Sequence, residues 1–276
     1  MPSSIQVLSD IHLEIERSQD TIEYETFKVT PVAPILALLG DIGTANDPRL
    51  FEFIRTQLHQ FKAVLYVLGN HEFYWNSYDS VTKAFEDFED SITAERASGS
   101  SPTLGEFVLM NRRSYSPGPE TNTIILGCTL WSALNPADLE FLIWGLNDFR
   151  AIKGMNPEVF CKLHEEEISW LRSKIERIKI DFPEKDIVIL THHAPTVDGT
   201  ANPKYKGGPT NSAFATELTG EGFWGEPIKT WAFGHTHWTC DFVRGGIRVV
   251  SNQRGYKHRI DEQAEPFDGK FVIEMG

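Results

Sequence analysis

Seven short apolar runs, each followed at once by polar residues, limit the fold of this chain more than any other feature. They occupy residues 5–8, 35–39, 63–68, 123–126, 187–190, 231–233 and 247–250. Near-continuous runs of Val, Ile and Leu of this length are typical of central strands that are covered on both faces. Apolar residues also recur at helical spacing between the runs, at 48–61 and 157–178. This alternation predicts an α/β protein, either a simple α/β domain or an α/β/β/α sandwich.

The expected domain organisation is a single domain over residues 1–276. Hydrophobic residues make up 41% of the chain and charged residues 24%, which is typical of globular proteins. Stretches rich in Gly, Ser or Pro are expected to be loops, at 98–103, 114–123 and 198–222. Strand runs that the core needs lie on both sides of these stretches. We therefore interpret them as loop insertions near 98–123 and 198–222, and not as linkers between domains.

The charge balance is acidic, with 39 Asp and Glu against 26 Lys and Arg and a formal net charge of −13. This balance makes nucleic acid an improbable partner and argues against docking on anionic lipid. No apolar run approaches the ~18 residues of a membrane span, so no membrane association is expected. The three cysteines (Cys128, Cys161 and Cys240) cannot form a disulfide framework, and the start of the chain lacks the features of a signal peptide. These features together predict a cytoplasmic protein.

Polar side chains gather directly after the predicted strands. They are Asp10, His12, Asp41, Asn70, His71, His192, His235 and His237. In α/β sheets the ligand crevice lies at the carboxyl ends of the strands, so residues far apart in the sequence can meet there. The set contains two carboxylates, one amide and five imidazoles, which can ligate metal ions without any cysteine. An anionic substrate would find its positive charge in such ions.

Taken singly, the motifs around these residues are common turns, but their order along the chain is specific. It runs Asp10-Ile11-His12, Gly40-Asp41, Gly69-Asn70-His71-Glu72, a strand-terminal His192, and Gly234-His235-Thr236-His237. This ordered set closely resembles the signature of the calcineurin-like metallophosphoesterase superfamily. The resemblance implies a four-layer α/β/β/α sandwich and a centre of two divalent metal ions. It also implies phosphoester hydrolysis by in-line attack of a hydroxide that bridges the two ions.

The resemblance assigns a role to each position of the motifs. The implied metal ligands are Asp10, His12 and His237 for one ion and Asn70, His192 and His235 for the other, with Asp41 bridging both. His71 would face the substrate as general acid or oxyanion stabiliser, so His71 and Asp41 are the predicted catalytic residues. Mixed imidazole and carboxylate ligands suit Mn²⁺, Fe or Zn²⁺, and the sequence does not choose among them.

Three further residues are candidates for substrate binding. His193 follows the predicted ligand His192 and points to the opposite face of an extended segment, where it would face the substrate, support a ligand or simply pack. Arg254 and Tyr256 belong to Asn252-Gln253-Arg254-Gly255-Tyr256, which is similar to an accessory motif of the family except that Gln253 replaces proline. Arg254 could bind phosphate through its planar guanidinium, or it could form a salt bridge at the sheet edge.

Two other features bear on the substrate pocket. Gly127 to Trp131 and Asn147-Asp148 also look like accessory motifs of the family. Lys204, Tyr205 and Lys206 lie in the glycine-rich stretch 198–222, where they could form a basic lid or be ordinary loop residues.

The predicted function is metal-dependent hydrolysis of a small phosphodiester or phosphomonoester, with the diester slightly favoured. The family resemblance does not separate these substrates. A nuclease is the main alternative, and it would need a positive groove wide enough for a duplex. A non-catalytic scaffold that binds metal is less well supported, because every ligand position and His71 carry the residue that the family motif requires.

Overall fold

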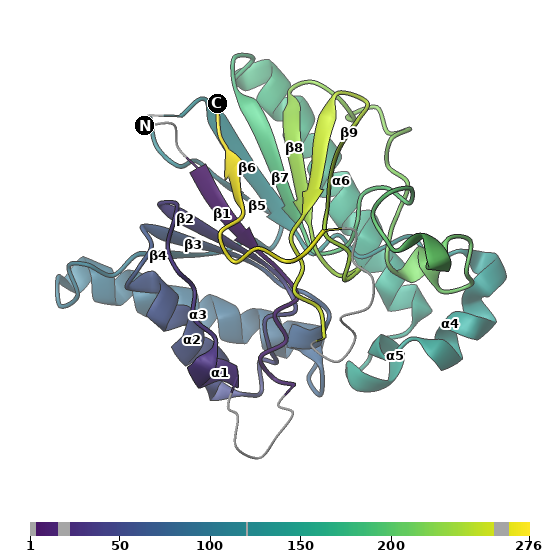
Figure 1. Cartoon of the computed structure of the whole chain (residues 1–276), viewed down its shortest axis with the longest axis horizontal. Coiled ribbons are helices and arrows are strands. Elements are labelled where there is room, and N and C mark those ends of the chain that lie inside the picture. The colour runs from purple at the N-terminus through teal and green to yellow at the C-terminus, as the bar shows by residue number, and fades with distance from the viewer. Residues whose placement is uncertain (1–3, 16–22, 120, 257–264) are drawn as a thin grey trace.

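Two β-sheets pack face to face, with helices on the outer face of each (Figure 1). The computed structural model describes residues 4–15, 23–119, 121–256 and 265–276. The first sheet has the strand order β11 (Val272–Glu274), β1 (Ser4–Leu8), β2 (Ile35–Leu39), β3 (Ala63–Val67) and β4 (Glu106–Leu109). The second has the order β5 (Arg113–Tyr115), β6 (Thr123–Cys128), β7 (Asp186–Thr191), β8 (Ile228–Phe233), β10 (Ile247–Ser251) and β9 (Cys240–Arg244).

The helices lie mainly between the strands in sequence. They are α1 (Glu23–Thr26), α2 (Pro48–Leu58), α3 (Tyr78–Ser98), α4 (Leu139–Gly145), α5 (Asp148–Ala151) and α6 (Pro157–Asp181). Short 3₁₀ turns occur at His71–Phe73, Pro136–Asp138, Pro203–Tyr205 and Asn211–Ala213. Side-chain oxygens cap the long helices at their first turns, from Asp47 for α2, Ser77 for α3 and Asn156 for α6. Within the described residues, no helix is long and apolar enough to cross a bilayer.

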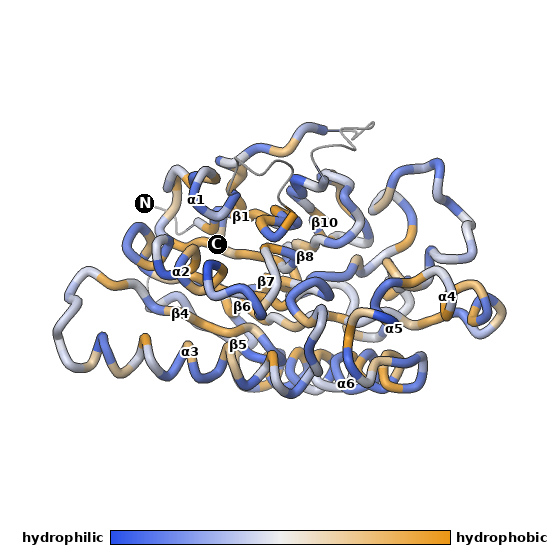
Figure 2. Tube along the Cα trace, turned by 90° about the horizontal axis from the view of Figure 1, so that it is seen from below, coloured by the Kyte–Doolittle hydropathy of each residue, from blue (hydrophilic) through white to orange (hydrophobic). Residues whose placement is uncertain are grey.

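The strand residues alternate between two cores, which is why the apolar runs are nearly continuous. In β2, Ala37 and Leu39 face the core between the sheets, where they join Leu190 of β7. Leu36 and Leu38 point the other way, into the core beneath α2 and α3. A third cluster joins the outer face of the second sheet to α6. Figure 2 shows apolar residues concentrated along the central strands, while the surrounding helices alternate between apolar and polar residues. The predicted four-layer α/β/β/α sandwich is therefore confirmed.

The prediction of a loop insertion near 98–123 is wrong in part. Residues 106–109 form β4, which extends the first sheet parallel to β3, and residues 113–115 form β5, which pairs antiparallel with β6. Both are edge strands of three or four residues, so any apolar run in them is too short to stand out in the sequence. Phe107, Val108 and Leu109 are nevertheless buried. The segment 198–222 contains two short 3₁₀ turns and one isolated bridge, between Ala215 and Ala194, but no longer helix or strand.

The central strands of both sheets are parallel, and their carboxyl ends meet at one edge of the sandwich. β1, β2 and β3 pair in parallel in the first sheet, as do β6, β7 and β8 in the second. Hydrogen bonds join the two sheets at this edge. Thr129 donates its hydroxyl to the carbonyl of Leu68 at 2.8 Å, and a ring nitrogen of His192 lies 2.8 Å from the carbonyl of Leu39. The polar residues that follow the strands therefore converge on one place.

A buried carboxyl group fixes the segment that follows β6. Glu167 of α6 is fully buried and accepts a hydrogen bond from the backbone nitrogen of Trp131 at 2.9 Å. Burial raises the pKa of Glu167 from its ordinary 4.5 to about 7. Because the folded protein binds this proton more tightly than the unfolded chain does, the folded state loses stability as the pH rises through 4.5 towards 7.

We expect Glu167→Gln to stabilise the protein at pH 8.5 but not at pH 5. The neutral amide avoids the cost of ionising the buried group, which the rise in pKa puts at roughly 3 kcal/mol. This corresponds to a melting temperature higher by about 6–12 °C. Thermal melting of both proteins at the two pH values measures the effect. Glu165→Gln, on the exposed face of the same helix, is the matched control. An equal shift at both pH values would contradict this explanation.

Candidate metal centre

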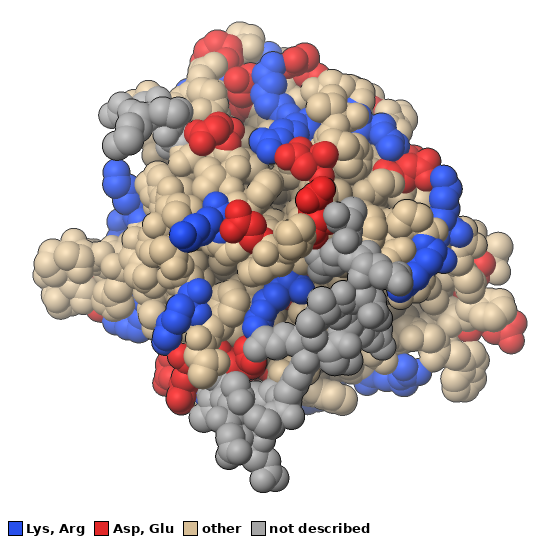
Figure 3. Space-filling view, viewed as in Figure 1, with Lys and Arg blue, Asp and Glu red and all other residues tan. Residues whose placement is uncertain are grey.

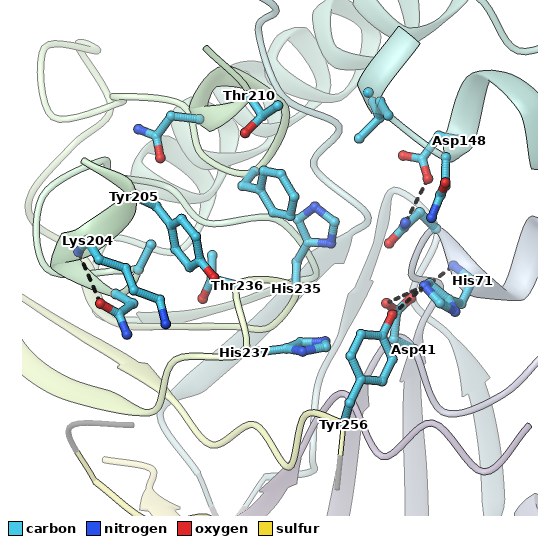
Figure 4. Close-up of a pocket in the computed structure, with 18 of the residues that line it drawn as sticks. Asp41, His71, Asp148, Lys204, Tyr205, Thr210, His235, Thr236, His237 and Tyr256 are labelled. Carbon is cyan, nitrogen blue, oxygen red and sulfur yellow. Dashed lines mark hydrogen bonds and ion pairs between the residues drawn. The ribbon is translucent and has the colours of Figure 1, made fainter. Parts of the chain in front are cut away.

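The structure brings all eight predicted strand-end residues to one edge of the sandwich, beside a cavity of about 420 Å³. Asp41, Asn70, His71, His235 and His237 line the cavity directly. Figure 4 shows His71 and Asp148 on one side of the cavity, Lys204 and Tyr205 on the other, and Asp41, His235 and His237 between them. Asp10, His12 and His192 are buried behind this surface.

The backbone at this edge is held in an uncommon conformation. Asp10, His12, Asp41, His235 and His237 all have positive φ angles, between 50° and 72°. Among the described residues, only three other non-glycine positions share this property. The left-handed region costs free energy for residues with a Cβ, and such positions cluster at functional sites, where the surrounding structure enforces them. The strain turns each side chain from the end of its strand towards a common centre.

One group of donor atoms is formed by Asp10, His12 and His237. The facing ring nitrogens of His12 and His237 lie 3.0 Å apart, and a carboxylate oxygen of Asp10 lies 3.4 Å from His237. Both oxygens of Asp10 also accept hydrogen bonds from the backbone nitrogen of His235, at 3.1 and 3.0 Å. Burial alone would raise the pKa of Asp10, but the hydrogen bond and charge of His237 outweigh it and lower the pKa to about 2. Asp10 is therefore ionised and fixed in place at neutral pH, as a metal ligand needs to be.

A second group of donor atoms is formed by Asp41, His192 and His235, whose ligand atoms all lie within 4.8 Å of one another. Asn70 adds its side-chain oxygen, which lies 3.1 Å from Nε2 of His192. Nδ1 of His192 donates to the carbonyl of Leu39, so Nε2 is the nitrogen with the free lone pair, and it faces Asp41 at 3.4 Å. The glycine at 69 makes this arrangement possible, because a Cβ there would collide with the Asp41 carboxylate.

Asp41 lies between the two groups and offers one oxygen to each. Its Oδ1 faces His192 at 3.4 Å, and its Oδ2 faces His12 at 3.8 Å. The backbone nitrogen of His71 donates to Oδ1 at 2.9 Å, which fixes the rotation of the carboxylate. Burial raises the pKa of Asp41 well above its ordinary value, and a cation beside the carboxylate would lower that pKa again. A carboxylate in this position has the geometry of a bridging ligand.

The protonation of the imidazoles also fits metal binding. Burial, reinforced by neighbouring imidazoles, lowers the pKa of His12 to about 4 and lowers that of His235 far below its ordinary value. These rings are therefore neutral at pH 7, which is the form that ligates metal. Nε2 of His235 is buried without a hydrogen-bond partner. An unpaired buried nitrogen is costly unless it binds something, and a metal ion satisfies it.

Glu14 is a residue of the site that the sequence motifs did not include. Its Oε1 lies 3.0 Å from Nδ1 of His12 and 2.9 Å from Nδ1 of His71. One carboxylate oxygen thus accepts from both rings, which directs the Nε2 atoms of His12 and His71 towards Asp41. Asp41 and Glu14 together raise the pKa of His71 to about 9 against the effect of burial. The signal in the sequence was the position of Glu14, two residues after His12.

We expect Glu14→Gln to lower both metal affinity and turnover by about 10- to 100-fold. The amide lacks the charge that holds the two rings in one orientation. Loss of a hydrogen-bond partner of a metal-binding histidine typically lowers affinity or activity by this factor. Competition against a fluorescent chelator measures the affinity, and initial rates measure the turnover. Glu25→Gln is the matched control because its side chain is exposed. A variant with unchanged affinity and rate would show that Glu14 does not orient the rings.

Two other buried carboxyl groups support the site. Asp148 accepts hydrogen bonds from the Asn70 amide at 2.8 Å and the Tyr74 hydroxyl at 2.9 Å, so the Asn70 oxygen points towards His192. Glu72 accepts from three backbone nitrogens and one hydroxyl, those of Asp41, Ile42, Gly69 and Tyr66. Both residues stand in motifs noted in the sequence, but most of their partners lie outside the same motif.

The three predicted substrate contacts lie in different surroundings. Tyr256 lines the cavity, and its hydroxyl lies 3.3 Å from Nε2 of His71. His193 is fully buried and packs against the His235 ring at 4.1 Å, so it lies behind the cavity wall. Arg254 forms a salt bridge with Glu23 at 3.1 Å and donates to a backbone carbonyl, and it does not line this cavity. Of the two uses suggested for Arg254, the salt bridge is the one present.

Of the three loop residues suggested as a basic lid, only two line the cavity. Lys204 and Tyr205 line the cavity. Lys206 pairs with Asp198 at 2.8 Å and does not line it. Trp131 is fully buried in the core and so does not contribute to the cavity surface.

Comparison with known proteins identifies the family. The family model described as calcineurin-like phosphoesterase matches residues 3–239. An uncharacterized protein of Acanthamoeba polyphaga mimivirus is 29% identical over 269 residues, which cover 92% of this chain and 91% of that protein. The crystal structure of phosphopantetheinyl hydrolase from Mycobacterium tuberculosis superposes with a TM-score of 0.65 over 93% of this chain and 91% of that one, at 14% identity. At that identity the likeness shows a shared fold. Since the family model spans most of the chain, this protein belongs to the calcineurin-like phosphoesterases and is an enzyme of metal-dependent phosphoester hydrolysis.

Proposed function

We propose that this enzyme hydrolyses a small phosphodiester or phosphomonoester at the cavity beside Asp41. The observation that carries the proposal is the position of Asp41 between two groups of donor atoms, with His71 beside it. In this proposal Asp10, His12 and His237 hold one divalent ion, and Asn70, His192 and His235 hold the other. Asp41 is shared by both, and residues 1–276 act as one domain.

The bound ions would supply positive charge for the phosphate oxygens and lower the pKa of water to near neutrality. The donor set of imidazoles, carboxylates and one amide favours Mn²⁺, Fe or Zn²⁺. The protein's own residues would position the ester. The raised pKa of His71 keeps its ring protonated at neutral pH, so its Nε2 can donate a proton to the leaving oxygen. The Tyr256 hydroxyl beside Nε2 would help to hold that ring in place.

The surroundings of the cavity favour a small substrate over a polynucleotide. Among the described residues that line it, Lys204 is the only lysine or arginine. On the face shown in Figure 3, basic and acidic side chains are interspersed across the described surface, without a broad basic area. Polynucleotide binding depends on several simultaneous phosphate contacts by Lys and Arg. A small ester needs only the local charge of the metal centre.

Metal removal and restoration test this proposal. The purified protein is stripped with a chelator and assayed on bis(p-nitrophenyl) phosphate and p-nitrophenyl phosphate, before and after Mn²⁺, Zn²⁺ or Fe²⁺ is added. We expect no turnover without metal and restored turnover with at least one ion, with the diester favoured. A monoester preference would select the phosphomonoester form of the proposal. Turnover that is unaffected by chelation would contradict it.

A further inference from the structure

The cavity continues beyond the candidate metal centre on the side away from His71. This extension is lined by Ala201, Asn202, Lys204 and Tyr205, with Thr210 and Asn211 beside them. Figure 4 shows Tyr205 and Lys204 separated from His71 and Asp148 by the histidines of the centre. A group bound in the extension therefore lies on a different side of the phosphorus from a leaving group that His71 protonates.

The chemistry of the extension is aromatic and mostly uncharged. The Tyr205 side chain is exposed, and the ammonium of Lys204 lies 5.2 Å from the centre of its ring. The other side chains there are amides, a hydroxyl and a methyl group. An exposed ring in a cavity wall is suited to stacking against a planar group. With Lys204 as the only lysine or arginine among the described lining residues, the wall is unsuited to a polyanion.

Hydrogen bonds order the loop that carries this wall and attach its later part to the body of the protein. Within the loop, the backbone nitrogen of Tyr205 donates to the carbonyl of Asn202 at 3.0 Å, and that of Lys204 donates to the Asn202 side chain at 3.0 Å. Further along the same loop, Ser212 and Thr216 accept hydrogen bonds from backbone nitrogens of residues 135 and 133, at 3.0 and 2.8 Å. A surface held in this way loses little conformational entropy when it binds a ligand.

We propose that Tyr205, with Lys204 beside it, binds the non-leaving organic group of a phosphodiester, and that this group is planar and carries at most one negative charge. The inference rests on the proposed function and makes it more specific. A phosphomonoester has no non-leaving organic group, so it would leave this wall without a partner. The enzyme is therefore a phosphodiesterase whose selectivity comes from residues outside the metal centre.

The test compares two diesters with the same leaving group, phenyl p-nitrophenyl phosphate and methyl p-nitrophenyl phosphate. We expect the wild-type enzyme, restored with its activating metal, to prefer the phenyl ester in kcat/KM by about 3- to 10-fold, the contribution of one aromatic pair. Tyr205→Ala should bring the phenyl-to-methyl ratio to within about twofold of one, and Tyr205→Phe should keep it. A wild-type ratio near one, or an unchanged ratio in Tyr205→Ala, would overturn the inference.

Lys204 is tested with a charged version of the same ester. For the ester with a carboxylate on its non-leaving phenyl ring, Lys204→Gln should lower kcat/KM by about 2- to 5-fold, as expected for the loss of an exposed ion pair. The matched control is Lys206→Gln, because Lys206 lies in the same loop but pairs with Asp198. Equal effects of the two substitutions would assign the change to overall charge and contradict a contact with Lys204.

A binding measurement separates failure of this inference from failure of the proposed function. Diphenylphosphinate and dimethylphosphinate cannot be hydrolysed, and their dissociation constants can be measured by calorimetry. Tyr205→Ala should weaken the binding of diphenylphosphinate, relative to the binding of dimethylphosphinate, by about 3- to 10-fold. If neither diester is hydrolysed but this shift is present, the wall binds as inferred and the proposed catalysis is wrong. If the esters are hydrolysed and the shift is absent, only the inference about Tyr205 is wrong.

Discussion

Replacing Asp41 with Asn should lower kcat/KM for bis(p-nitrophenyl) phosphate by about 10³-fold or more. The carboxylate lies between the two donor groups and faces each with one oxygen, at 3.4 and 3.8 Å. An amide keeps the shape but removes the negative charge that would hold two cations close together. We therefore expect the metal content of Asp41→Asn, measured by inductively coupled plasma mass spectrometry, to fall from about two ions per chain to one or fewer.

The control for this substitution is Asp241→Asn. Asp241 is an exposed carboxylate of β9 that pairs with Arg248 at 2.6 Å and does not line the cavity. Its replacement should leave rate and metal content unchanged. An Asp41→Asn variant that keeps both ions and most of its activity would show that Asp41 does not bridge them.

Replacing His71 with Gln should lower kcat by a factor that depends on the leaving group of the ester. For an ester with an alkyl leaving group, we expect kcat to fall by about 10²- to 10⁴-fold, the usual contribution of a positioned general acid. For p-nitrophenolate, which leaves without a proton, the loss should be much smaller. The pKa of His71 is raised to about 9, so the proton-donating form is lost as the pH rises through that value. The rate on the alkyl ester should therefore decline at high pH, and bound cations move the decline to lower pH.

The pH profile gives the stricter comparison. In His71→Gln the decline on the alkyl ester should disappear, because the titrating donor is gone. His59→Gln is the matched control, since His59 is exposed at the end of α2. A loss of equal size for both leaving groups, with an unchanged profile, would assign His71 a role in binding the phosphate and not in proton donation.

The central strands and the layers were predictable because their residues face two cores at once. In β2, for example, Ala37 faces one core and Leu38 the other, so the run is apolar throughout. The edge strands β4, β5, β9 and β11 were not predicted. Such strands are short or half exposed, as in β9, whose residues alternate between exposed and partly buried positions after Cys240. Periodicity over three to five residues is too weak to identify them.

The candidate ligands were predictable from motif order, and the structure brings them together. Which ions they hold stays a prediction. The supporting carboxylates were harder. Asp148 bonds to Asn70 of another segment, and Glu14, although it lies two residues after His12, also bonds to the distant His71. No local pattern encodes these contacts between segments. The same limit applies to His193 and Arg254. Their residue types suit substrate binding, but only the tertiary structure places one behind His235 and the other against Glu23.

Anomalous diffraction from a crystal of the Mn²⁺-loaded protein tests the central claim most directly. The account predicts two peaks of anomalous density at the carboxyl edge of the sheets. One should lie among Asp10, His12 and His237, the other among Asn70, His192 and His235, and the Asp41 carboxylate should contact both. A spacing of ~3.5–4 Å between the peaks is expected for a pair that acts on one phosphate. A single peak, or density at other residues, would contradict the two-ion centre.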